Sequence, residues 1–128
     1  MRLLLDTHIL LWALTDDARL PERARELLLD SRNEVFFSAA SVWEIAIKRS
    51  LRREAISISA EEAVRFFRAA GYKELAVSAT HAAKVETLAP IHADPFDRLL
   101  VAQAMTEPML LITHDRTIAS YGPEIILV

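Results

Sequence analysis

Two aspartates stand directly after apolar runs of the kind that proteins bury. Asp6 follows Leu3–Leu5 in LLLDTH, and Asp115 follows Leu110–Ile112 in LLITHD, with a threonine and a histidine beside each acid. A carboxylate in apolar surroundings costs several kcal/mol unless it is paired. The two acids are therefore expected either to face a common partner or to cap the helices that follow them.

Two further acids lie within apolar helical stretches. Glu44 occurs in SVWEIAIK and Asp97 occurs in DPFDRLLVAQA, and both have mainly apolar neighbours. Asp94 lies on the same side of the helix start as Asp97, and its position directly before Pro95 favours an N-cap role. The chain thus holds a set of acids that are not easily explained as ordinary surface residues.

Carboxylates gathered in one place need a counter-charge, because two of them about 4 Å apart repel by roughly 4 kcal/mol at an effective dielectric constant of about 20. The chain has no cysteine, and its four histidines are scattered at positions 8, 81, 92 and 114. Oxygen ligands favour Mg²⁺ or Mn²⁺, which orients a phosphate and lowers the pKa of a bound water. The residues alone therefore indicate a metal-dependent phosphoryl-transfer site, with His8, His92 and His114 as hydrogen-bonding groups at its edge.

The elements that must position these acids alternate between strands and helices. Strands are expected at Leu3–Leu5, Glu34–Phe37, Glu74–Val77, Met109–Thr113 and Ile125–Val128. Helices are expected from Ile9, from Pro21 at the first helical position, from Ser38 or Ser41 through Ile47, from a capping box at Ser59, after Ser78 and after Asp94. This alternation predicts a single domain over residues 1–128 with a three-layer α/β/α fold around a mostly parallel sheet of four or five strands. Sites in such sheets form beyond the carboxyl ends of the strands, where Asp6 and Asp115 stand.

Composition excludes some classes of protein. A net charge of −3 argues against a protein that holds nucleic acid by overall basicity. One basic stretch is either a solvated helix end or a basic edge that contacts nucleic acid beside an acidic site, and it comprises Lys48, Arg49, Arg52 and Arg53. Asp6 and His8 interrupt the first apolar run too early for a secretory signal, and no run approaches the roughly 20 apolar residues of a membrane span. We expect a cytoplasmic protein.

Four stretches, LLLDTH, SAASVWEIAIK, HADPFDRLLVAQA and LLITHD, in this order and spacing resemble the PIN-domain ribonucleases. The resemblance is closest to toxins of VapBC-type toxin–antitoxin pairs, which belong to the PilT N-terminus-like group, and it covers essentially the whole chain. It implies an α/β/α domain whose acids bind Mg²⁺ or Mn²⁺ and which hydrolyses RNA by a metal-activated water. It also implies a small cognate antitoxin.

The resemblance assigns roles residue by residue. The acids that it makes catalytic and metal-binding are all present: Asp6, Glu44, Asp97 and Asp115. Thr7 and Thr113 correspond to flanking hydroxyls that position acids or water. Asp94 belongs to the narrower D-P-F-D-R form, so its role stays open between a helix cap and a group that supports the acids. His114 is expected to support the acids by hydrogen bonding.

The apolar content of 52% indicates either a large core or apolar surface that a partner covers. The stretches ILLWAL, RARELLLD and FFRAAGY offer such faces. We expect a homodimer through part of this surface and, by resemblance, an antitoxin whose amphipathic C-terminal segment lies in a groove of the remainder. A basic side chain of that segment would enter the acidic cluster and switch the enzyme off.

Other classes fit less well. A phospho-acceptor receiver domain needs an aspartate after a middle strand, which EVFFSAAS lacks, and a late lysine, whereas Lys84 is the last one in the chain. A haloacid-type phosphotransferase needs a second aspartate where His8 stands. The remaining alternative is a catalytically silent PIN scaffold that binds RNA or a protein partner. Metal binding discriminates the two, because a scaffold has no reason to keep four converging carboxylates.

Overall fold

Five short strands form one sheet in the middle of the molecule, in the computed structural model that describes residues 1–52 and 56–128. The strands are β1 (Arg2–Leu5), β2 (Glu34–Ser38), β3 (Lys73–Leu75), β4 (Leu110–Thr113) and β5 (Ile125–Leu127). Their order across the sheet is β3-β2-β1-β4-β5, and every neighbouring pair runs parallel. The α/β prediction is confirmed, and the sheet is parallel throughout instead of mostly parallel.

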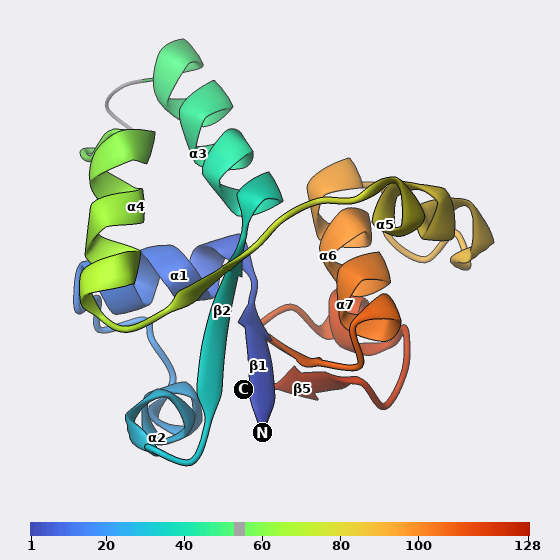
Figure 1. Ribbon diagram of the computed structural model, residues 1–128, viewed down its shortest axis with the longest axis horizontal. Helices are drawn as coiled ribbons and strands as arrows, with labels where there is room; N and C mark the ends of the chain where they lie inside the picture. Colours follow the sequence, from blue (N-terminus) through green and yellow to red (C-terminus); the bar gives the residue numbers. More distant parts are fainter. Residues whose placement is uncertain (53–55) are drawn as a thin grey trace.

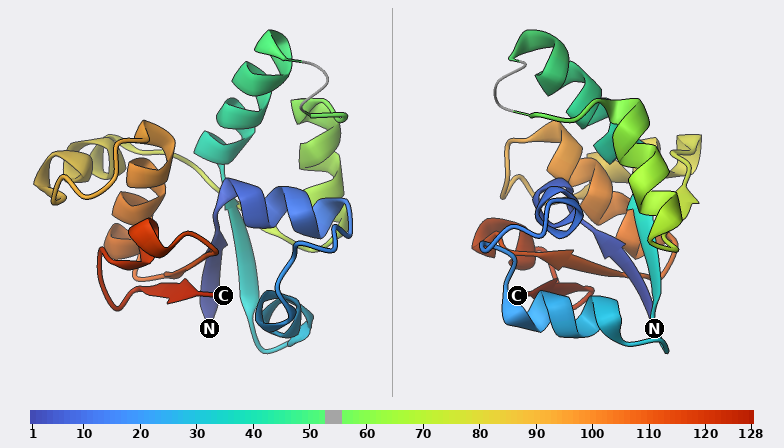
Figure 2. Two further views of the ribbon diagram at one scale, coloured as in Figure 1. Left: turned by 180° about the vertical axis from the view of Figure 1, so that it is seen from behind. Right: turned by 90° about the vertical axis from the view of Figure 1, so that its left-hand side faces the viewer.

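Helices cover both faces of the sheet and complete the three layers (Figure 1). One face carries α1 (Thr7–Leu14), α2 (Glu22–Leu29), α3 (Ala39–Leu51) and α4 (Ala60–Ala69). The other carries α5 (Ala79–Lys84), the 3-10 turn η2 (Val85–Thr87), α6 (Pro95–Thr106) and α7 (Arg116–Ala119). The view from behind in Figure 2 shows the same division.

The alternation of side chains along the central strands supplies the two cores. Leu3 and Leu5 point into the core under α1, α2, α3 and α4, where Phe67 also packs. Leu4 points the opposite way, into the core that α6 and α7 cover, together with Leu111. All five side chains are buried, and full burial of one such side chain stabilises the fold by about 1.5–3 kcal/mol. The first strand is therefore fixed from both sides, and so is the residue that follows it.

Helix starts largely follow the predicted capping residues. Ser38 is the residue that caps α3, Ser59 caps α4 through a full capping box, and Ser78 caps α5. Pro21 is the N-cap of α2 instead of its first helical residue, because its ψ of 147° is extended. Among the described helices, none is both long and apolar enough to cross a bilayer.

Several boundaries differ from expectation by one or two residues, and helix α1 begins at Thr7 instead of Ile9 because Asp6 caps it. Two further differences also have physical reasons. The third strand is shorter than the predicted Glu74–Val77, because β2 ends at Ser38, the residue that pairs with Leu75, and leaves nothing beyond for a longer β3 to pair with. Helix α3 continues past Ile47 to Leu51, with Lys48 and Arg49 in its last turn, where cations complement the helix dipole.

Candidate metal centre

Asp6 and Asp115 lie at the same edge of the sheet because they follow the adjacent parallel strands β1 and β4. Each also caps the next helix. Asp6 Oδ1 accepts the N–H of Ile9 at 2.9 Å, and Asp115 Oδ1 accepts the N–H of Thr117 at 2.8 Å. The two alternatives drawn from the sequence are therefore not exclusive, because each aspartate caps a helix with one oxygen and keeps the other for the site.

Thr113 links these two acids. Its hydroxyl donates to Asp6 Oδ2, and its oxygen accepts the N–H of Asp115 at 3.0 Å. Asp6 is buried, with 3% of its surface exposed. Burial raises the pKa of its carboxyl above 3.8, and the hydrogen bond from Thr113 opposes that rise.

Glu44 reaches the site from the first half of α3 and is also buried. Its Oε1 accepts the hydroxyl of Thr7 at 2.7 Å, and its Oε2 lies 2.7 Å from the ammonium of Lys48, one helical turn further on. The hydrogen bond to Glu44 raises the pKa of Lys48, and the carboxylates of Asp94 and Asp97 add to the rise. Lys48 is therefore a cation of the acidic cluster.

Asp97 lies where the carboxylates crowd most. Its pKa is raised from 3.8 to about 6, chiefly by burial and then by the nearby charges of Asp94, Glu44 and Asp6. Its Oδ2 lies 2.9 Å from Nε2 of His92. A cation bound beside Asp97 would therefore favour its ionised form.

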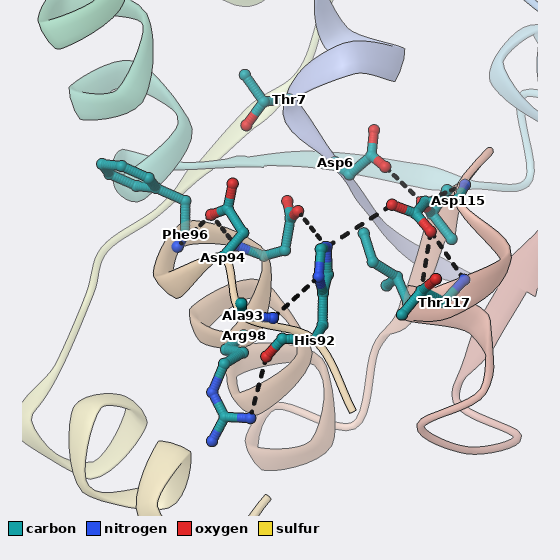
Figure 3. Close-up of polar contacts among 12 residues, drawn as sticks. Asp6, Thr7, His92, Ala93, Asp94, Phe96, Arg98, Asp115 and Thr117 are labelled. Atoms are coloured by element: carbon teal, nitrogen blue, oxygen red, sulfur yellow. Dashed lines mark hydrogen bonds and ion pairs between the residues drawn. The ribbon is translucent and has the colours of Figure 1, made fainter. Parts of the chain in front are cut away.

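His92 bridges two acids that come from different elements. Besides its contact with Asp97, its Nε2 lies 3.7 Å from Asp115 Oδ2 (Figure 3). His92, Asp97 and Asp115 each offer one ligand atom within 4.8 Å of the others. The sequence suggested His92 only as a hydrogen-bonding group at the edge, whereas the fold puts it between two carboxylates.

A network that the sequence did not indicate holds His92 in place. The backbone N–H of His92 donates to the hydroxyl of Tyr121 at 2.9 Å, and Arg98 donates to the same hydroxyl at 3.0 Å. Arg98 also donates to the carbonyls of Ala89 at 3.0 Å and Val85 at 3.2 Å. The only sequence signal was an arginine directly after Asp97, which gave no hint of Tyr121.

Asp94 and His114 lie beside the cluster without pairing to its acids. Asp94 Oδ1 accepts the N–H of Phe96 at 2.8 Å and of Asp97 at 3.3 Å, which is the N-cap role that Pro95 favoured. The Nδ1 of His114 donates to the carbonyl of Val128 at 2.6 Å.

The residues of the basic stretch lie in different surroundings along α3. Lys48 faces the acids, whereas Arg49 lies near enough to Glu62 of α4 to lower the pKa of that carboxyl, after the larger effect of the Ser59 hydrogen bonds. Arg52 is the exposed C-cap residue of α3. Arg53 lies outside the described residues.

The donor set fits a hard divalent cation. Asp6, Asp97 and Asp115 offer carboxylate oxygens, and burial followed by the charges of neighbouring acids raises the pKa of Asp97, which a bound cation would oppose. Mg²⁺ and Mn²⁺ prefer such oxygen ligands.

Comparisons with known proteins identify the family to which this three-layer α/β/α domain belongs. A family model of the PIN domain matches residues 3–122, and the chain belongs to that family. The comparison with curated proteins gives no match.

Solved structures share the fold. A chain of VapBC2 from Rickettsia felis, bound to a promoter DNA fragment, aligns at a TM-score of 0.72 and 18% identity, covering 100% of this chain and 98% of that one. A chain of a toxin–antitoxin complex from Klebsiella pneumoniae gives 0.67 and 18%, covering 96% and 94%. A chain of DNA-bound VapBC from Salmonella typhimurium gives 0.67 and 16%, covering 100% and 97%. At these identities the likeness establishes the fold alone.

Proposed function

We propose that this protein is a Mg²⁺- or Mn²⁺-dependent endoribonuclease and the toxin of a type II toxin–antitoxin pair. The observation that carries the proposal is the gathering of carboxylates around Asp97, whose pKa is raised to about 6 by burial and by the charges of Asp94, Glu44 and Asp6. The PIN family supports a nuclease, and the VapBC complexes of the same fold support the toxin role.

In this proposal the acids hold the cation and their neighbours hold the acids. Asp6, Asp97 and Asp115 supply oxygens directly, and Glu44 completes the acidic set. The bound ion would stabilise negative charge that develops on the phosphate and would acidify a water. Thr113 connects Asp6 to Asp115 through its two hydrogen bonds, and Thr7 orients Glu44 by donating a hydrogen bond to it.

His92 positions Asp97 from the other side of the cluster. The backbone N–H of Ala93 donates to Nδ1 of His92 at 3.1 Å, so the ring proton sits on Nε2 and points at Asp97 Oδ2. This hydrogen bond orients the carboxylate of Asp97 and leaves its second oxygen for the cation. We therefore assign His92 as a positioning residue.

Partners follow from the exposed apolar side chains. Leu29 of α2 is 78% exposed and Phe66 of α4 is 53% exposed, and both lie in stretches that the sequence marked as apolar faces. A shallow hollow of about 120 Å³ between α1 and α4 has Leu14 and Phe66 in its lining. We propose that a second copy of the chain covers part of this surface and an amphipathic antitoxin segment covers the rest, with a basic side chain in the acidic cluster. Light scattering that showed only monomer at micromolar concentration would refute the dimer.

Cleavage of RNA by the purified protein tests the enzymatic part. Cleavage should require Mg²⁺ or Mn²⁺, stop in EDTA, and fall by more than about a hundredfold in Asp6→Asn, which keeps the shape of the side chain but removes its charge. Glu34→Gln is the matched control, since Glu34 starts β2 at the opposite edge of the sheet, where it pairs with Lys73 at 2.6 Å. Undiminished cleavage by folded Asp6→Asn would disprove the mechanism.

A further inference from the structure

A hollow of about 310 Å³ opens directly beside the acidic cluster. Two carboxylates and three rings line it, namely Asp6, His8, Trp12, His114 and Asp115. A molecule in this hollow therefore touches two of the proposed metal ligands on one side and aromatic surface on the other.

The fold brings the three rings together through the same two strands that deliver the acids. His8 follows Asp6 into α1, and Trp12 lies one turn further along that helix. His114 stands beside Asp115 after β4. The Trp12 ring lies 6.0 Å from that of His8, inclined at 48°, and 5.8 Å from that of His114, inclined at 68°. The rings form one wall, which we call the aromatic wall.

Contacts outside the hollow hold this wall in place. Trp12 is half-buried and packs on the core beneath α1. The guanidinium of Arg19 lies 5.5 Å from the centre of the indole and pairs with Asp17 at 2.8 Å. The hydrogen bond from His114 to the Val128 carbonyl fixes the second imidazole. A wall arranged in advance in this way costs less conformational entropy when a ligand binds.

The chemistry of the lining selects a flat, polar heterocycle over an aliphatic side chain. The neighbouring hollow of about 490 Å³ shares His8 and Trp12 but is also lined by Leu11, Ile56 and Ile58. Among the described residues, the hollow beside the acids is lined only by rings and carboxylates. Nucleobases combine a stacking face with polar edges, and unpaired bases of RNA stack on tryptophan and histidine.

We propose that the aromatic wall binds the base of a nucleotide adjoining the scissile phosphate. A phosphodiester bound to a cation that Asp6 and Asp115 hold would carry a nucleoside on each side, and the hollow begins at those same two residues. The inference rests on the proposed function, and it makes His8, Trp12 and His114 a nucleoside subsite. It gives this end of α1 a role in substrate binding in addition to its packing.

Binding of mononucleotides tests the subsite without any cleavage. In the presence of Mg²⁺, the four ribonucleoside 5′-monophosphates are compared with ribose 5-phosphate, which has the same sugar and phosphate but no base. Binding of each probe is measured by NMR, through the indole N–H signals of Trp12 and Trp43 in the full chain. Trp43 is 61% exposed and does not line the hollow, so it is an internal control.

At least one nucleotide should shift the Trp12 signal and bind about five- to 150-fold more tightly than ribose 5-phosphate, as expected for one stacked base. Trp12→Leu keeps apolar packing but removes the stacking face, so it should abolish this preference, whereas Trp43→Leu should retain it. His8→Ala, at an exposed position, should weaken the preference without affecting the fold.

Equal binding of nucleotides and ribose 5-phosphate, or no shift of Trp12 with any nucleotide, would overturn the proposal even if the protein cleaves RNA. A preference for nucleotides that survives in Trp12→Leu would overturn it too, and loss of antitoxin binding in that variant would then mark the hollow as a protein-docking site. If the base preference is found but no RNA is cleaved, the subsite stands and the proposed function fails.

Discussion

His92 and Asp97 are joined at 2.9 Å between Nε2 and Oδ2, although one residue belongs to a loop and the other to the first turn of α6. The same nitrogen lies 3.7 Å from Asp115, which begins α7. One imidazole thus connects the starts of two helices at the acidic edge. The position of each acid depends on this contact and on what holds the ring.

The crowding at Asp97 gives a pH dependence of stability. Because the pKa of Asp97 is about 6 when folded against an ordinary 3.8, the folded state binds this proton more tightly than the unfolded state. The resulting stabilisation is complete below pH 3.8 and is lost as the pH rises through about 6. Relative to Asp97→Asn, the wild-type free energy of unfolding should fall by about 2–3 kcal/mol over this range.

Urea unfolding in EDTA measures this difference. Mn²⁺ should restore stability to the wild type at neutral pH, since a bound cation favours the ionised carboxylate. If the free energies of unfolding of the wild type and Asp97→Asn changed in parallel with pH, the raised pKa of Asp97 would be contradicted.

Tyr121→Phe should loosen the loop that carries His92. The change removes the oxygen that accepts the His92 N–H and an Arg98 N–H. We expect a loss of about 1 kcal/mol in stability and about tenfold in Mn²⁺ affinity, measured by calorimetry. Tyr72→Phe is the control, because the Tyr72 ring stacks on Phe67 on the other face of the sheet and should leave Mn²⁺ affinity unchanged.

Lys48→Met should leave Glu44 without its cation. Glu44 is buried, whereas the Lys48 side chain is 49% exposed, so we expect a loss of about 1–2 kcal/mol in EDTA. Mg²⁺ should shrink that loss, because it supplies positive charge to the same acids. In Lys73→Met, whose partner Glu34 is half-exposed, the free energy of unfolding should stay close to that of the wild type, because water screens exposed ion pairs. If Mg²⁺ did not reduce the loss of stability in Lys48→Met, Lys48 would not belong to the metal site.

Asp94 can be tested as a cap and as a charge. Asp94→Asn retains a capping oxygen and should unfold like the wild type, whereas Asp94→Ala should lose about 1 kcal/mol. Both remove a charge that raises the pKa of Asp97, so both should shift the pH dependence of Mn²⁺ binding to lower pH. A greater loss of cleavage in Asp94→Asn than in Asp97→Asn would instead make Asp94 a ligand.

Much of this arrangement could be predicted from the chain alone. Apolar runs predict β1 and β4, and an acid directly after each run lies at the carboxyl edge by the geometry of parallel sheets. Capping residues fix the starts of α3, α4 and α6. These signals are local, because a few consecutive residues determine a strand, a cap or an apolar helical turn.

What the sequence did not predict depends on packing between distant segments. The contact of Tyr121 with the His92 loop joins one residue that precedes β4 in the chain and one that follows it. It arises only when α6 and α7 pack together. The length of β3 depends on where β2 ends. The position of Lys48 depends on how α3 lies over the acids of α6. None of these has a signature within a short window of sequence.

The central place of β1 has a consequence for synthesis on the ribosome. One edge of β1 can pair with β2 early, but its other edge stays open until residues 110–113 of β4 emerge. Asp6 meets Thr113 and Asp115 only then, so a nascent or prematurely terminated chain carries an incomplete site. The acidic cluster, and any chemistry that depends on it, therefore forms only after β4 and the residues that follow it have left the ribosome.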